Sequence, residues 1–358
     1  MDTINWAESM QRSYEYYIVD PNTWRDIRPL RLVKRSAVDW DSDADTLGSA
    51  TFDMDEDIGE QYVRIYMIVI QNGVKHRLEQ GTFLIQTPSL SDDGKVTSVT
   101  ADAYTPLIEL TEKHLPIGYC ARRDTNIMDL AYNLVREGAR APVVKTECTE
   151  ILHDDFTADP DDTYLTFIRD LISNAKYELG LDERGRILFI PKRDTAALRP
   201  VKTFNDSNSS IVLPGIDVDT DIYKIPNVVN VVYSNGSKVF NVTVKNEDNS
   251  SPTSIQARGR EIQHRVVNPT LLGDADDDGV RVREYAEQLL KELSSVERTV
   301  MFTHAYCDVK NGDCVRLDFS NPNIKLHDVK ARIINQSISH TPDCPVTTTA
   351  VYTHKYWR

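Results

Sequence analysis

Strand-like segments are concentrated in two blocks of this sequence, roughly residues 14–103 and 216–358, with a mixed segment between them. Within the blocks, β-branched and aromatic residues form short runs that turn residues separate. Asn-Gly pairs occur in both blocks and favour tight hairpins, because both residues tolerate positive φ. Two β-rich blocks predict a chain built mainly from antiparallel sheet.

The clearest hairpin of the first block is centred on Asn72-Gly73. The run 61–71 is rich in β-branched and aromatic residues, and a return strand is predicted over 74–86. Further predicted strands lie before and after this hairpin, at 15–19, 30–38, 49–54 and 95–102. Together they predict a meander of about six strands, which is the size of a small barrel or sandwich.

The middle segment combines helical and strand patterns. Apolar residues spaced by three and four predict a short helix at 103–115 and longer helices at 124–137 and 161–179. Gly180 is expected to end the last of these. A hairpin is predicted over 181–193, with its turn at 182–185. The segment therefore indicates a compact α/β insert.

The second block starts near Ile216, after a stretch at 203–215 that reads as a polar connector. A hairpin is predicted from strands 228–233 and 239–244, followed by a Ser/Asn/Pro-rich loop at 246–260. The remaining expected elements are a helix at 278–294 and strands at 299–305, 313–317, 328–339 and 347–354.

The predicted fold class is α+β, mainly β, with two antiparallel β-barrel-like domains and a small α/β insert between them. The expected boundaries are 1–115 for the first β domain (completed by 200–225), 116–200 for the insert and 216–358 for the second β domain. Whether the two blocks arose by duplication stays open, because they do not align residue by residue.

Composition excludes several classes. The net charge of −14 argues against a protein that wraps nucleic acid. No apolar run approaches the ~20 residues needed to span a bilayer, and the N-terminus lacks the pattern of a signal peptide. We therefore expect no membrane anchor and assembly in the cytoplasm. The five cysteines are scattered and are expected to be reduced.

One acidic loop resembles a metal site. Asp274, Asp276 and Asp278 precede Gly279 with the spacing of a calcium loop, but Tyr285 stands where the bidentate Glu should be. An acidic first turn of the following helix is the competing interpretation. Elsewhere the eight histidines are dispersed, and no nucleophile elbow, phosphate loop or dinucleotide fingerprint occurs. We therefore predict no catalytic residues, no enzymatic activity and no cofactor.

Two basic clusters are candidate interface sites. Arg25, Arg28 and Arg31 form one, and Arg258 and Arg260 form the other. In so acidic a chain they favour contact with an acidic neighbouring protein, although a solvated strand face is the alternative.

A longer pattern resembles a known family. The segment 216–233, with sequence IDVDTDIYKIPNVVNVVY, resembles the segment that opens the second tube domain of phage baseplate hub proteins. The hairpin 181–191 and the order β block, two-helix insert, β block are similar to the same family. The resemblance is to central baseplate hubs of contractile-tailed phages and tail-like particles, the late control D and T-even hub-like proteins, and it covers about residues 15–355.

This resemblance implies a homotrimer in which each chain supplies two tube domains. Three chains would then form a pseudo-hexameric ring that joins a hexameric tail tube to a trimeric central spike and lines a DNA channel. The implied partners are the chain itself, the tail tube protein, the spike protein, the tape measure protein and baseplate wedge proteins, with DNA only in transit. The implied location is the baseplate of the virion tail. Lytic activity is expected on another chain.

Two alternatives remain open. The first is the N-terminal core of a tail-tip protein from a long-flexible-tailed phage, which shares this fold. The second is a β-rich hydrolase, for which a concave site with a perturbed histidine or carboxylate would be the evidence.

Overall fold

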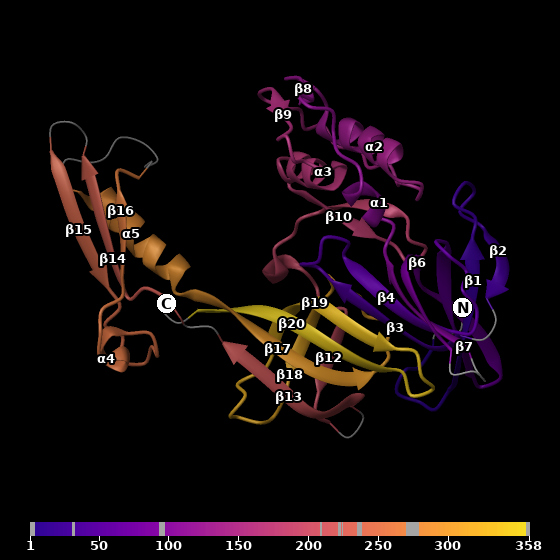
Figure 1. Ribbon diagram of the computed structural model, residues 1–358. Helices are drawn as coiled ribbons and strands as arrows, with labels where there is room; N and C mark the ends of the chain where they lie inside the picture. The colour runs from indigo at the N-terminus through magenta and orange to yellow at the C-terminus, as the bar shows by residue number, and fades with distance from the viewer. Residues whose placement is uncertain are drawn as a thin grey trace. The chain divides into compact units, whose positions relative to one another are not determined.

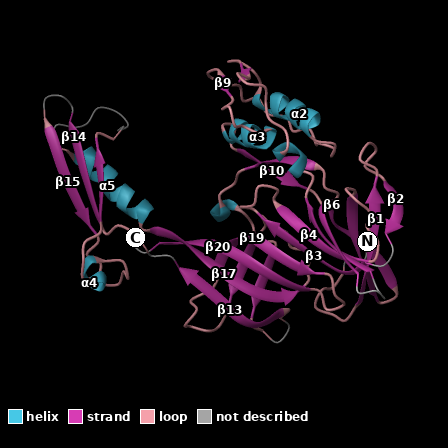
Figure 2. Cartoon of the chain, in the orientation of Figure 1, coloured by secondary structure: helices cyan, strands magenta, loops and turns pink. Residues whose placement is uncertain are grey.

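The computed structural model describes residues 4–30, 33–92, 97–207, 210–220, 223, 225–234, 238–269 and 279–355. Strands account for 47% of the structure and helices for 14%, so the predicted mainly β, α+β class is confirmed. Figures 1 and 2 show the strands and the helices along the chain. In the described part of the chain, no helix is long and apolar enough to cross a membrane.

The chain divides into two compact units. The first comprises Met1–Gly215 and Phe302–Thr349, and the second comprises Ile216–Met301 and Ala350–Arg358. Each unit is therefore built from two separate segments of the chain. The domain boundaries expected from the sequence remain a prediction.

A 13-stranded sheet is the largest element. Its strand order is β13-β17-β20-β19-β3-β4-β7-β6-β5-β1-β2; off this path, β18 pairs with β19 and β12 pairs with β18. The pairings of the described strands leave this order open rather than closed into a barrel. The strands are β1 (Gln11–Val19), β2 (Asp26–Leu30), β3 (Val33–Asp41), β4 (Gly48–Met54), β5 (Tyr62–Gln71), β6 (Val74–Asp92), β7 (Thr97–Tyr104), β12 (Lys202–Asn205), β13 (Val212–Thr220), β17 (Ser295–Ala305), β18 (Cys314–Asp318), β19 (Val329–Ser339) and β20 (Pro345–Lys355).

Strands of the two sequence blocks are neighbours in this sheet. β3 of the first block pairs antiparallel with β19 of the second, with Val38 opposite Ile338. The predicted hairpin at Asn72-Gly73 is confirmed: β5 and β6 pair antiparallel, and both turn residues have positive φ. β5 is buried along most of its length, which explains its nearly continuous apolar sequence.

The insert of the first unit contains α1 (Ile108–Thr111), α2 (Ile127–Gly138) and α3 (Tyr164–Ser173). Two short sheets accompany them: β8 (Cys120–Ala121) with β9 (Phe156–Thr157), and β10 (Tyr177–Leu181) with β11 (Ile187–Pro191). A 3₁₀ turn, η1 (Thr195–Ala197), follows. The apolar faces of α2 and α3 form one core with Trp24, Tyr62 and Leu84 of the main sheet region.

The second unit contains a three-stranded sheet with the order β15-β14-β16. These strands are β14 (Val228–Ser234), β15 (Val239–Lys245) and β16 (Gln263–Val267), and the predicted hairpin of β14 and β15 is confirmed. α5 (Val280–Leu293) packs one face against the sheet, where Val282, Ala286 and Leu290 are fully buried. The short helix α4 (Ile255–Arg258) lies in the segment predicted to be a loop.

Several predicted bounds were wrong. The helix expected over 161–179 ends at Ser173, because Lys176 takes a positive φ and Tyr177–Leu181 forms a strand. Gly180 does not end a helix but lies in β10, where a Cβ would stand 2.2 Å from Ile190. The helix expected over 103–115 is a single turn, α1. The expected connector 203–215 contributes to β12 and β13, because β12 pairs in parallel with the distant β18.

Candidate functional site

The first basic cluster lies at an edge strand. β2 ends the order of the main sheet, and Ile18 pairs with Arg28 while Val19 pairs with Asp26, so Ile27 is the extra residue of a β-bulge. Ile27 is 63% exposed. Arg25 and Arg28 are exposed beside it, and Arg28 lies 3.2 Å from Glu56. This exposed ion pair contributes little stability, so Arg28 is accessible to a partner.

The second basic cluster lies in the second unit, between α4 and β16. Arg260 is exposed, and its backbone carbonyl accepts a hydrogen bond from Asn227 at 3.0 Å. Arg258 is only half-exposed, and its guanidinium donates to the carbonyl of Ile225 at 3.0 Å. Burial, followed by the charge of Arg260, lowers the pKa of Arg258. Arg258 therefore has a structural role at this loop, whereas Arg260 is presented to solvent.

Two sequence candidates cannot be placed. Arg31 and the acidic loop with Asp274, Asp276 and Asp278 lie outside the described residues. Within the described ranges, no cluster of three or more His, Cys, Asp or Glu side chains could hold a metal ion.

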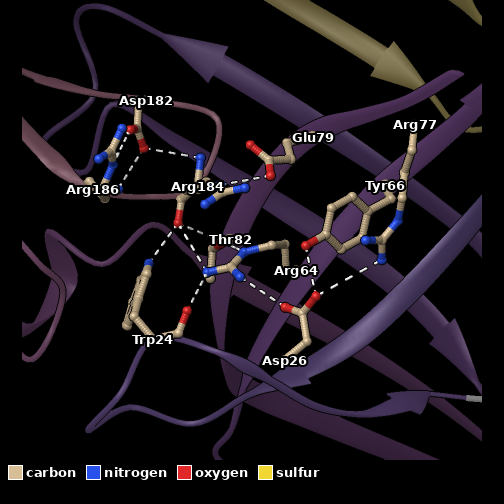
Figure 3. Close-up of polar contacts among 10 residues, drawn as sticks. All are labelled: Trp24, Asp26, Arg64, Tyr66, Arg77, Glu79, Thr82, Asp182, Arg184 and Arg186. Atoms are coloured by element: carbon tan, nitrogen blue, oxygen red, sulfur yellow. Dashed lines mark hydrogen bonds and ion pairs between the residues drawn. The ribbon is translucent and has the colours of Figure 1, made fainter.

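The sequence did not predict the polar junction between the main sheet and the turn of the β10–β11 hairpin (Figure 3). The backbone carbonyl of Arg184 accepts three hydrogen bonds there: from the Trp24 indole at 2.7 Å, the Thr82 hydroxyl at 2.9 Å and Arg64 at 3.4 Å. No side-chain pattern could have revealed it, because the acceptor is a backbone atom. The junction fastens the insert hairpin to β5, β6 and the turn before β2.

Arg64 is the buried charge of this junction. Only 4% of it is exposed, and it forms an ion pair with Asp26 at 2.8 Å. Asp26 also accepts a hydrogen bond from the Tyr66 hydroxyl at 2.8 Å, and the Arg77 guanidinium stacks 3.4 Å from the centre of the Tyr66 ring. A buried guanidinium with so many partners is costly to unpair, so the junction fixes one geometry. It offers support and orientation, not a reactive group.

The hydrolase alternative would need an accessible nucleophile and base. The nearest arrangement is Ser36, whose hydroxyl lies 2.6 Å from His340 Nδ1 and 2.7 Å from the Tyr16 hydroxyl. Both Ser36 and His340 are 7% exposed, and burial lowers the pKa of His340 to about 3. His340 Nε2 has no hydrogen-bond partner among the described residues. Because the lowered pKa makes His340 a poor proton acceptor and the site is buried, this arrangement does not support the hydrolase alternative.

No family model matches the sequence, and no curated protein is significantly similar to it. Solved structures do share its fold. The tail protein from Neisseria meningitidis MC58 superposes with a TM-score of 0.62 at 12% identity, over 95% of this chain and 96% of that one. The prophage MuSo2 43 kDa tail protein from Shewanella oneidensis gives 0.60 at 10% identity, over 96% and 98%.

The chain has the fold of a phage tail protein. The same fold occurs within a longer chain: a structure of the Francisella PdpA-VgrG complex superposes with a TM-score of 0.56 at 9% identity, over 99% of this chain and 54% of that chain. The expected likeness to tail proteins is therefore confirmed at the level of fold. In this tail-protein fold, the exposed edge at β2 is accessible to a partner, and the junction at Arg184 fastens the insert hairpin to the main sheet.

Proposed function

We propose that this chain is a structural baseplate hub without enzymatic activity. In this proposal three copies form a pseudo-hexameric ring that joins the hexameric tail tube to the trimeric central spike and lines the DNA channel. Two tube domains, 1–115 completed by 200–225 and 216–358, would supply two wall segments per chain, with the insert 116–200 beside them. The observation that carries the proposal is the likeness of fold to two tail proteins over nearly the whole of both chains.

The open strand edges give this proposal a physical basis. A sheet edge presents unpaired backbone N–H and C=O groups, which a neighbouring strand can satisfy. β2 and β13 end the order of the main sheet, and β15 and β16 are the outer strands of the small sheet. The basic residues Arg25, Arg28 and Arg260 lie beside two of these strands. A closed ring of subunits would cover such edges.

The chain's acidity fits a channel protein. With a net charge of −14, a lining of carboxylates would repel DNA and let it pass without binding. The partners in this proposal are a second and third copy, the tail tube protein, the spike protein, the tape measure protein and wedge proteins, all in the baseplate of a virion tail.

The test is the mass of the native assembly by light scattering, measured alone and with tube or spike protein. We expect this chain to contribute three times its own mass of 40.7 kDa to the assembly. A monomer in every mixture would contradict the proposal.

A second candidate is the core of a tail-tip protein from a long-flexible-tailed phage. The observation that favours it is that the fold also occurs as part of a longer chain in the PdpA-VgrG complex. Electron microscopy of particles that contain this chain separates the two, because a contractile sheath above the ring is expected for the hub and a flexible, sheathless tail for the tip protein.

A further inference from the structure

A cavity of about 460 Å³ lies in the first unit, between β6, the β10–β11 turn and the loop that follows β17. Its wall combines two aromatic side chains, Trp40 and Tyr306, with two buried amides, Gln80 and Gln336. The volume falls within the ~300–1,000 Å³ typical of ligand sites. Aromatic side chains beside polar acceptors suit a flat, polar, hydrogen-bonding group.

A β-bulge builds this wall. Ile65 pairs with Gly81 and Tyr66 pairs with Glu79, so Gln80 is the extra residue, and its amide donates to the Tyr306 hydroxyl at 3.0 Å. Gly81 has a φ of +139°, and a Cβ there would stand 3.1 Å from the Trp40 ring. The bulge thus places the Gln80 amide on Tyr306, and Gly81 brings the backbone close to Trp40 in a conformation that favours glycine.

The charge of the cavity is not balanced. Figure 3 shows Glu79 and Asp182 of its wall held by Arg184 and Arg186, and Glu183 pairs with Lys310. The lining arginine, Arg77, is bound to Glu15 at 3.4 Å. Asp308, by contrast, is an exposed carboxylate without an ion-pair partner in the part of the chain that the structure describes. The charge left unpaired is therefore negative.

We propose that this cavity receives an arginine side chain from a neighbouring protein, with its guanidinium stacked on Trp40 and paired with Asp308. Arginine fits both features because its planar cation stacks on aromatic rings and also pairs with carboxylates. A lysine would pair with Asp308 but would stack less well on Trp40. A glutamine carries no charge that could pair with the carboxylate. The identification of the arginine's source as another protein of a virion tail rests on the proposed function. The binding of a guanidinium in this cavity does not depend on the proposed function.

The test uses the full chain labelled with 5-fluorotryptophan, titrated with the peptide acetyl-Gly-Arg-Gly-amide and followed by fluorine NMR. Trp40→Phe assigns the Trp40 resonance, and Trp24, which is 8% exposed, serves as an internal reference. We expect the Trp40 resonance to shift with saturation while Trp24 stays fixed. The same peptide with Gln in place of Arg should leave both unchanged.

Asp308→Asn should weaken peptide binding about tenfold, because a charge-assisted hydrogen bond is lost. Asp154→Asn is the matched control, since Asp154 is an exposed carboxylate of the insert outside the cavity wall.

Equal shifts with the Gln peptide, no shift at Trp40, or unchanged affinity in Asp308→Asn would overturn the proposal. A Trp40 shift that follows protein concentration instead of peptide would assign the cavity to a second copy of the chain and also overturn it. If light scattering shows no trimer but the arginine peptide binds as expected, the proposed function is rejected and the guanidinium site still stands.

Discussion

The indole nitrogen of Trp24 donates a hydrogen bond to the backbone carbonyl of Arg184 at a distance of 2.7 Å. The two residues are 160 positions apart, one before β2 and the other in the turn between β10 and β11. This bond, with those from Thr82 and Arg64, ties the insert to the main sheet. Local stability at this turn should therefore depend on residues that are remote in sequence.

Removing the charge of Asp26 should destabilise the first unit strongly. Asp26→Asn leaves the buried guanidinium of Arg64 without its counter-ion, and we expect a loss of about 3 kcal/mol in the free energy of unfolding. Urea unfolding followed by tryptophan fluorescence measures it. Glu56→Gln, which breaks the exposed pair with Arg28, is the control and should cost under about 1 kcal/mol. Equal costs for the two variants would show that the junction is not a stabilising contact.

Gly185→Ala should detach the hairpin turn from the sheet. Gly185 has a φ of +73°, and a Cβ there would stand 2.9 Å from Thr82. Gly73 has a similar φ of +80° with open space around it, so Gly73→Ala carries the backbone strain, about 1 kcal/mol, without the clash. Hydrogen exchange by mass spectrometry should show faster exchange over 182–191 in Gly185→Ala only. Protection that is unchanged there, relative to Gly73→Ala, would contradict the docking of this turn.

Stability should fall as the pH falls below about 6.5. Burial lowers the pKa of His340 to about 3 and that of His304 to about 4, so between these values and 6.5 the unfolded chain binds protons that the folded chain does not. Their contribution is complete above pH 6.5 and is lost toward the folded-state pKa values, at up to about 1.4 kcal/mol per pH unit for each histidine. Unfolding midpoints of the protein and of His340→Gln, measured from pH 4 to 7, should differ in slope. His153→Gln, at an exposed position, should keep the original slope.

A charge at Ile27 should disrupt assembly without unfolding the chain. Ile27 is 63% exposed on the bulge of edge strand β2, so Ile27→Asp places a carboxylate at the edge that the proposed ring would cover. We expect a mass near that of one chain by light scattering and an unchanged circular dichroism spectrum. Ile117→Asp is the control, because Ile117 is 93% exposed in the insert. An intact trimer in Ile27→Asp would exclude this edge from the interface.

Local signals in the sequence predicted the local structure well. The Asn72-Gly73 hairpin, the β14–β15 hairpin and the apolar stripe of α5 all follow from residue types within a few positions of one another. Prediction was wrong where distant segments decide the outcome. Residues 203–215 read as a polar connector, yet residues 203–205 lie in β12 because β18 pairs beside them in the fold.

Prediction of the candidate sites was limited in the same way, because it failed where distant segments decide the outcome. Arginines such as Arg25 and Arg28 could be identified as candidates from the sequence alone. The Arg184 junction and the Asp308 cavity could not, because they depend on a backbone carbonyl, a β-bulge and contacts between segments more than 100 residues apart.

A cryo-electron microscopy reconstruction of tails or tail-like particles that contain this chain tests the proposed trimeric hub most directly. We predict three copies of the chain at the tip of the tube, arranged as a ring with six similar wall segments around an open channel. Density for the chain away from the tube tip, or a ring of six copies, would contradict it.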